Sequence, residues 1–224
     1  MKRSEINRCI AEAAEFFAEN HFMLPPYAEW TLDTWRRSGS EADELRTHKL
    51  GWDVTDFSSG EFDSLGLTLF TLRNGSPDGG KVYAEKIMFV RENQVTPFHY
   101  HVRKTEDIIN RGGKGTGKLV VQLYNSAPDG ELAQTPVSVS CDGIRRQVEA
   151  GATVILGPGE SITLTPYLYH QFHAVDGQGL IGEVSSVNDD ASDNYFLQPL
   201  PRFPQIVEDE APVRLLCTEY GKRD

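Results

Sequence analysis

The hydrophobic residues near the start of the chain recur at the spacing of an amphipathic helix. Between residues 4 and 20, apolar positions follow one another at intervals of three and four, with polar residues between them. Ser4 is a suitable N-cap, and Pro25-Pro26 ends any continuation, because proline has no backbone N–H to donate. The pattern predicts a helix over residues 4–20, then a short helix and loops over residues 27–49. The apolar positions are Ile6, Cys9, Ile10, Ala13, Ala14, Phe16 and Phe17.

From about residue 52 the pattern changes to short segments rich in valine, isoleucine, leucine and threonine. Glycine, proline, asparagine or aspartate interrupts the chain at nearly every break between them. Repeated short strands with turn signals, and no helical pattern between them, favour an antiparallel sandwich or barrel. The predicted strands fall within residues 65–75, 81–90, 117–125, 135–140, 152–157, 161–166 and 180–187.

These patterns divide the chain into three parts that together form one domain. Residues 1–50 are a helical extension packed on a barrel, and residues 51–198 form the barrel itself. Residues 199–224 are a C-terminal extension with four prolines and little periodicity before VRLLCTEY. We expect this last part to pack across the barrel or to lie at a subunit contact.

Composition and charge narrow the class of protein. The chain has 224 residues, 39% of them hydrophobic, and a net charge of −11. Such an acidic chain argues against binding to nucleic acid or to an anionic membrane surface, and no stretch approaches the roughly 20 apolar residues that span a bilayer. The first residues lack the uninterrupted apolar stretch of a signal peptide. Three widely spaced cysteines fit a reducing compartment, so we expect a cytoplasmic protein.

Three of the six histidines and one glutamate form the informative pattern. His99 and His101 stand two residues apart, so on a strand both imidazoles project to the same face. Glu106 follows after a short turn, and His170 follows a second turn in an adjacent strand of an antiparallel barrel. His99, His101, Glu106 and His170 are therefore predicted to hold one divalent ion, and this donor set suits Mn²⁺, Fe²⁺, Co²⁺, Ni²⁺ or Zn²⁺.

The three remaining histidines are weaker candidates for metal binding. His21 and His48 are read as ordinary core or surface residues. His173 is three residues beyond His170 and should face the other side of its strand.

The spacing HxHxxxxE and the later GExxxxTPxxxH resemble the two motifs of the cupin superfamily. The resemblance implies a mainly β, cupin-type jelly-roll barrel. Two positions depart from the usual pattern. Asn93 replaces a glycine six residues before the first histidine, and asparagine is the next-best residue for a left-handed turn. Thr165-Pro166-Tyr167 replaces the usual PxG turn. Neither departure touches a ligand position.

Longer runs resemble one family of cupins, the D-lyxose isomerases. They are MKRSEIN…LPPYAEW, HYHVRKTEDIINRGG and GEVSSVNDDASDN. By resemblance, the chain is a sugar ketol-isomerase that interconverts D-lyxose and D-xylulose and also acts on D-mannose and D-fructose. The resemblance implies Mn²⁺ as the ion, a pentose or hexose as the substrate, and a homodimer.

An aldose–ketose isomerase must move a proton between C1 and C2 of an open-chain sugar, which gives a cis-enediol intermediate. Glu183 is the candidate proton carrier if Ile181 and Ser185 share its face and apolar neighbours adjust its basicity. Lys104 is the candidate donor to a sugar oxygen. Each has a plain alternative: Glu183 as a solvent-exposed residue of an edge strand, and Lys104 as an exposed turn lysine.

Three further residues are candidates for contact with the sugar. Lys86 lies on an otherwise apolar strand, and Asp189 and Asp190 offer carboxylates to sugar hydroxyls. The two aspartates would equally serve to cap the next turn. Aromatic candidates for the pocket wall are Tyr27, Trp30, Phe98, Tyr167 and Tyr169.

Two other functions share the same ligand set. Iron dioxygenases among cupins use three histidines and one glutamate, but they would consume oxygen and need no residues like Lys104 and Glu183. A non-catalytic sugar-binding or storage cupin usually lacks metal ligands, and this chain has all four. The isomerase is therefore preferred.

Overall fold

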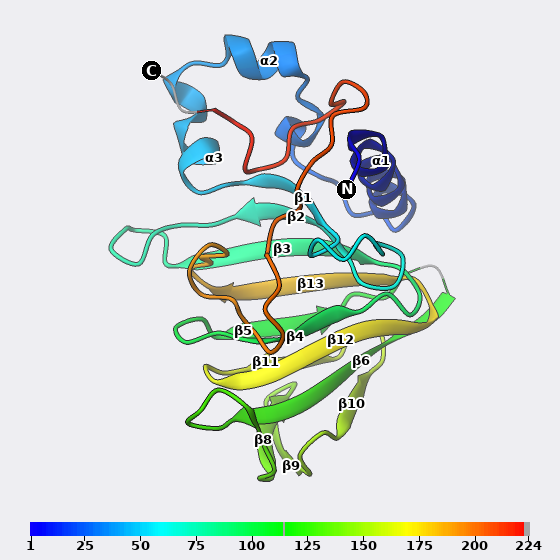
Figure 1. Ribbon diagram of the computed structural model, residues 1–224, viewed down its shortest axis with the longest axis vertical. Helices are drawn as coiled ribbons and strands as arrows, with labels where there is room; N and C mark the ends of the chain where they lie inside the picture. The colour runs from blue at the N-terminus through cyan, green and yellow to red at the C-terminus, as the bar shows by residue number, and fades with distance from the viewer. Residues whose placement is uncertain (114, 222–224) are drawn as a thin grey trace.

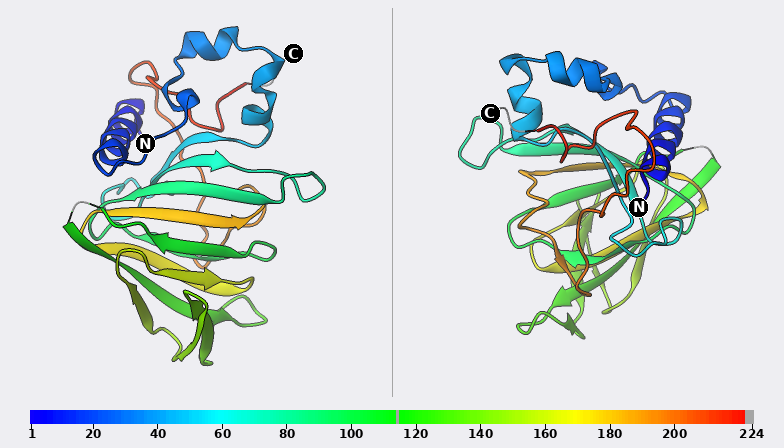
Figure 2. Two further views of the ribbon diagram at one scale, coloured as in Figure 1. Left: turned by 180° about the vertical axis from the view of Figure 1, so that it is seen from behind. Right: turned by 45° about the horizontal axis from the view of Figure 1, so that its top comes forward.

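A computed structural model describes residues 1–113 and 115–221. Its strands form two curled antiparallel sheets that pack face to face, and its helices gather at one end of the molecule (Figures 1 and 2). Among the described residues, no helix is long and apolar enough to cross a membrane.

The N-terminal helix forms where the periodicity predicts it, as α1 (Arg3–Glu19). Its N-cap is Lys2, so the choice of Ser4 was wrong: Ser4 instead donates its hydroxyl to Asp209, 2.7 Å away. The apolar stripe of α1 packs on the sheet, and Ile6, Ala13 and Phe17 are fully buried there. The following segment forms four short elements: η1 (Pro26–Glu29), α2 (Leu32–Arg37), η2 (Ser40–Ala42) and α3 (Asp43–Thr47).

The larger sheet has eight strands, and the smaller has five in a row with β7 (Leu132–Ala133) paired to β6. In spatial order the larger sheet contains β1 (Gly51–Thr55), β2 (Leu67–Arg73), β3 (Tyr83–Val90), β13 (Gly179–Ser186), β5 (Glu106–Asn110), β11 (Ser161–Leu164), β8 (Val137–Cys141) and β9 (Ile144–Val148). The smaller contains β10 (Thr153–Leu156), β6 (Gly115–Ser126), β12 (Leu168–Gly177), β4 (Thr96–Tyr100) and β14 (Tyr195–Phe196).

The core between the two sheets consists of side chains at alternate strand positions. Leu119, Val121 and Leu123 of β6 point into it, as do Leu168 and Phe172 of β12. Alternation of this kind leaves one face of each strand for the interior and the other for the outside. The interior is therefore apolar except around a group of buried polar side chains, which includes His99 of β4 and Glu183 of β13.

The two departures from the cupin motifs both lie in left-handed backbone. Asn93 has a φ of 62°, as expected for a residue that replaces a turn glycine. Tyr167 also has a φ of 62°, in the turn that leads into β12 and His170. Both residues therefore adopt the left-handed conformation that glycine adopts most readily.

The C-terminal segment packs against α1 and β1. Arg3, which is buried, pairs with Glu208 and Glu219 from that segment, and Leu216 forms a β-bridge with Trp52. Before it reaches α1, the segment crosses the open end of the barrel and places Arg202 inside it. The segment therefore joins α1 and β1 to the cavity, and the division of the chain into three parts stays a prediction.

Candidate metal centre

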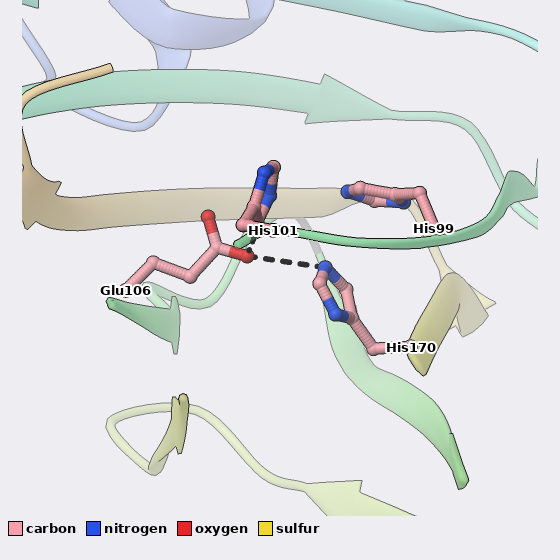
Figure 3. Close-up of side chains that lie close together, drawn as sticks. All are labelled: His99, His101, Glu106 and His170. Carbon is pink, nitrogen blue, oxygen red and sulfur yellow. Dashed lines mark ion pairs between the residues drawn. The ribbon is translucent and has the colours of Figure 1, made fainter. Parts of the chain in front are cut away.

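The side chains of His99, His101, Glu106 and His170 point toward one another inside the barrel (Figure 3). One ligand atom from each lies within 4.8 Å of the others, and all four residues are buried. His99 lies on β4 and His170 on β12, directly opposite each other in the strand pairing. The predicted ligands are thus brought together by one cross-strand pair and one turn.

The turn between β4 and β5 places the other two ligands. His101 follows the end of β4, and Glu106 begins β5. The carboxylate of Asp193 accepts backbone N–H bonds from Val102 at 2.9 Å and Lys104 at 3.1 Å, so it fixes the turn between them. Asp193 belongs to the VNDDASDN run, but its structural role was not foreseen from the sequence.

Each imidazole is held by a backbone carbonyl on its outer side. Nδ1 of His99 donates to Pro97 O at 2.9 Å, Nδ1 of His170 donates to Leu168 O at 3.0 Å, and Nδ1 of His101 donates to Asp193 O. Since a carbonyl only accepts, Nδ1 carries the proton, and each Nε2 presents its lone pair to the centre.

The inner side of the cluster has polar atoms without hydrogen bonds. Nε2 of His101 and Nε2 of His170 are buried and make no hydrogen bond of acceptable geometry, although Glu106 Oε1 lies 3.5 Å and 3.1 Å from them. Unpaired buried acceptors are costly unless a ligand satisfies them. Three imidazole nitrogens and a carboxylate around one point are the donor set of a divalent transition-metal ion, so the residues fit such an ion.

The protonation states also suit a cation. Burial, with the neighbouring His170 and His101, lowers the pKa of His99 well below its usual value, so His99 is neutral. Burial alone would raise the pKa of Glu106, but Lys104 and His101 outweigh it and hold that pKa well below the usual range. The centre therefore offers a neutral imidazole at His99 and an ionised carboxylate at Glu106.

A network of buried charges adjoins the ligands. Lys104 Nζ lies 2.5 Å from Glu106 Oε2 and 3.1 Å from Glu183 Oε1. Lys86 Nζ lies 3.4 Å from the same oxygen of Glu183. Lys86, Lys104 and Glu183 are only 3–5% exposed. The plain alternatives of an exposed turn lysine and a solvent-facing edge glutamate do not describe this structure.

The surroundings of Glu183 differ from the sequence expectation. Ile181 and Ser185 do share its face, and the Ser185 hydroxyl donates to Glu183 Oε1 at 3.2 Å. The nearest groups, however, are the ammonium groups of Lys86 and Lys104 rather than apolar side chains. Cross-strand pairing explains this, since Lys86 of β3 stands directly opposite Glu183 of β13.

The two neighbouring aspartates occupy different places. Asp190 is part of the cavity lining, and the cations Lys86 and Arg202 overcome its burial and keep its pKa well below the usual value. Asp189 lies on the outer rim, where its carboxylate accepts from the N–H groups of Ala191 and Ser192 and pairs with Arg103. The turn-capping alternative thus describes Asp189.

Sequence reasoning missed Arg202 and its partners. The Arg202 side chain is 9% exposed, and its Nη2 lies 2.5 Å from Asp53 Oδ2, while its Nε lies 3.6 Å from Asp190 Oδ1. Its Nη1 is buried without a hydrogen-bond partner. Asn188 accepts from Lys86 at 2.7 Å and also lies in this region. Arg202 stands between prolines in a segment without periodicity, so no pattern in the sequence marked it.

The cavity around these groups has an apolar wall that differs from the predicted one. Phe57, Phe172 and Phe196 line it, whereas none of the five aromatic candidates from the sequence does. A larger cavity of about 750 Å³ lies outside it, between α3, the β2–β3 loop and residues 186–193, and Asp190 borders both. The two cavities therefore adjoin at Asp190.

Comparison with known proteins agrees with this geometry. The family model of D-lyxose isomerase matches residues 1–220. A D-lyxose/D-mannose isomerase from Serratia proteamaculans is 52% identical, and one from Escherichia coli O157:H7 is 50% identical; each match covers 98% of both chains.

Solved structures of low sequence identity share the fold. A mutant L-ribose isomerase from Acinetobacter sp. DL28 in complex with L-ribose has a TM-score of 0.58 at 15% identity, covering 89% of this chain and 93% of that one. The L-ribose isomerase of Cellulomonas parahominis with L-ribose has a TM-score of 0.56 at 17% identity, covering 92% and 98%. The predicted mainly β, cupin-type fold is confirmed.

Proposed function

The chain belongs to the D-lyxose isomerase family of sugar ketol-isomerases, and from this premise we propose that it interconverts D-lyxose and D-xylulose with a divalent ion, Mn²⁺, held by His99, His101, Glu106 and His170. D-Mannose and D-fructose are the matching hexose pair. The observation that carries the proposal is the pair of buried, unpaired Nε2 atoms beside a buried Lys104–Glu183 pair.

The ion, when bound, supplies a Lewis acid for the oxygens on the two carbons that react. The protein residues move the proton. Glu183 carries it between C1 and C2 on one face of the open-chain sugar, which gives the cis-enediol intermediate. Lys104 donates to the sugar oxygen on which negative charge develops, since its burial makes that bond stronger than in water.

The remaining charged residues position the sugar. Lys86 and Asp190 also line the cavity and offer a donor and an acceptor to hydroxyls further along the sugar. Arg202 and Asn188 hold these two residues in place. Asp189 stays a prediction as a sugar ligand, because its carboxylate is already used by the turn.

The proposal also includes a cellular compartment and an oligomeric state. Cys9, Cys141 and Cys217 are buried free thiols, which supports a reducing compartment such as the cytoplasm. Burial raises the pKa of the Cys9 thiol to about 12, so this residue serves packing rather than reactivity. A homodimer is proposed by resemblance to other cupins.

An anaerobic assay after metal exchange tests the proposal. The protein would be stripped with a chelator, reloaded with Mn²⁺ and supplied with D-lyxose, and D-xylulose would be measured with oxygen excluded. We expect activity to disappear with the metal and to return with Mn²⁺ alone. A dioxygenase would need oxygen, and a binding module would give no product. Failure of the reloaded protein on both D-lyxose and D-mannose would refute the proposed substrates.

A further inference from the structure

The side chain of Asn74 is bonded to both backbone groups of Asn188. Asn74 directly follows β2 and is 6% exposed. Its Oδ1 accepts from the Asn188 N–H at 3.0 Å, and its Nδ2 donates to the Asn188 carbonyl at 2.9 Å. Nδ2 also donates to the carbonyl of His48, the C-cap of α3, at 3.3 Å. One buried amide therefore joins the ends of α3 and β2 to the loop after β13.

These bonds take the place of a strand partner. β13 makes its last pair with β3 between Ser186 and Tyr83, so Asn188 lies beyond the paired part of the strand. A side-chain amide has the same kinds of donor and acceptor as a peptide group. Two bonds to the N–H and C=O of one residue therefore reproduce the exchange between facing residues of an antiparallel pair. Asn188 thus keeps the bonding of a strand residue although it belongs to a loop.

The side chain of Asn188 reaches the charged groups of the inner cavity. Its Oδ1 accepts from Lys86 Nζ at 2.7 Å and from Lys104 Nζ at 3.5 Å. Its Nδ2 donates to Asp190 Oδ2 at 2.8 Å. Lys86, Lys104 and Asp190 line the cavity beside the metal centre, whereas Asn74 lines the outer one. Asn188 therefore connects a residue of the outer cavity to the charges of the inner one.

We propose that Asn74 is a positioning residue for the sugar: it holds Asn188, and through Asn188 it holds Lys86 and Asp190 where they meet the substrate. Groups carried on loops are placed less accurately than groups on strands, and a misplacement of about 1 Å is enough to weaken binding or turnover. The inference rests on the proposed function, since it requires that Lys86 and Asp190 contact the sugar. It deepens that function by assigning a role to a side chain outside the inner cavity.

Asn110 offers a matched control, because it has the same bonding in a different place. It is fully buried, and its Nδ2 donates to the carbonyls of Gly117 and Leu156 at 3.0 and 2.8 Å. Its Oδ1 accepts from the Gly112 N–H at 2.9 Å. Asn110 is the last residue of β5, at the opposite end from the metal ligand of that strand. Loss of its side chain should lower stability and leave sugar binding unchanged.

A double-mutant cycle on the Mn²⁺-loaded protein tests the proposal. Asn74→Ala, Asn188→Ala and their combination would be compared with Asn110→Ala in D-lyxose turnover, below the temperature at which any of them unfolds. We expect KM to rise about tenfold in Asn74→Ala and in Asn188→Ala, the effect of one hydrogen bond to a charged group. Bound metal should not change, and kcat should fall by no more than about threefold, since the contacts concern binding. Asn110→Ala should keep the KM and kcat of the wild type.

The combined variant shows whether Asn74 acts through Asn188. If it does, the two effects are not additive, and KM should stay about tenfold above the wild type rather than rise about 100-fold. An additive increase would overturn the proposal, and so would an equal increase in Asn110→Ala. If Asn74→Ala does not fold, Asn74→Ser replaces it in the cycle, because a hydroxyl and a water beside it can satisfy the backbone groups of Asn188 in part.

A crystal structure of the Asn74 variant separates this inference from the proposed function. If the wild type makes no ketose from D-lyxose or D-mannose, the proposed function fails, and the structure decides whether Asn74 holds Asn188. We expect the loop after β13 to shift and the contact of 2.7 Å between Lys86 and Asn188 to be lost. An unchanged contact would overturn the proposal whatever reaction the site performs.

Discussion

The two halves of the cavity are built in different ways. The metal half takes its ligands from β4, β12 and the start of β5, within two short runs of sequence. The charged half takes Lys86 from β3, Glu183 from β13, Asp190 from a loop and Arg202 from the C-terminal segment. Lys104 joins them, because it contacts both Glu106 and Glu183.

The difference in construction matches two different tasks, binding of a cation in one half and contact with the sugar in the other. In the metal half the Nδ1 atom of each imidazole donates to a backbone carbonyl, and Nε2 of His101 and of His170 is buried without a hydrogen bond, so that half is prepared for a cation. In the charged half each ion already has a partner, so the groups that would meet the sugar are held in place by one another. Buried paired charges lose much stability when one partner is removed. Changes to the first half should therefore remove the ion, and changes to the second should leave it bound.

The largest expected effect is in the metal half. His170→Ala removes one of four ligands, so we expect metal content and activity to be lost together. Loss of several kcal/mol of transition-state stabilisation corresponds to a decrease in kcat/KM on the order of 10³-fold or more. Metal analysis and turnover with D-lyxose check this. His21→Ala, at an exposed position beyond α1, should change neither quantity.

The substitution Glu183→Gln tests the charged half of the cavity without changing the metal half. It removes the proposed proton carrier without removing a ligand, so kcat should fall by about 10²–10⁴-fold while bound metal stays stoichiometric. Val184→Gln changes the adjoining outward residue, which is 42% exposed, and should retain normal turnover. Loss of the metal in Glu183→Gln would show that the two halves are not separable.

Lys104→Met affects both halves because Lys104 contacts each of them. We expect kcat to fall by about 10²-fold through loss of one donor, and the free energy of unfolding to fall by about 3 kcal/mol through two uncompensated carboxylates. Burial raises the pKa of Glu106, and Lys104 is the first of the groups that oppose it. Removing Lys104 raises that pKa, so protons should displace the metal at a higher pH than in the wild type. Metal retention against pH measures this.

The smallest effects should separate the two neighbouring aspartates. Asp190→Asn alters a buried group in the cavity, so KM for D-lyxose should rise by about tenfold, the effect of one charge-assisted hydrogen bond. Asp189→Asn alters a group on the exposed rim and should change KM less than twofold, which is on the order of 0.4 kcal/mol. Equal effects of the two substitutions would show that the rim also binds the sugar.

Sequence alone predicts the metal half well and the charged half only in part. The HxH spacing and alternate strand positions place His99 and His101 on one face, and the second motif adds His170. Glu183 and Lys104 were chosen from their positions, Glu183 on the strand pattern after His170 and Lys104 in the turn between His101 and Glu106, and their roles stay predictions. Arg202 and Asp53 were not, because they meet only after the C-terminal segment crosses the barrel. Contacts between segments that are far apart leave no local period in the sequence.

The same reason explains the errors in the fold. Short strands within residues 65–186 were predicted close to where they form, since alternation and turn residues are local signals. The N-cap of α1 was misplaced because Ser4 bonds to Asp209, a residue of the C-terminal segment. Phe98 of β4 was assigned to the pocket, but the alternation that points His99 inward points Phe98 outward.

The most direct test of the central claim is solvent exchange during turnover. Wild-type protein and Glu183→Gln, both loaded with Mn²⁺, would convert D-lyxose in D₂O through many turnovers, and NMR would locate deuterium in the products. If the charged half moves a proton, the wild type should yield D-xylulose with deuterium at C1, and Glu183→Gln should yield neither product nor label. D-Xylulose without deuterium, formed equally fast by both proteins, would contradict the account.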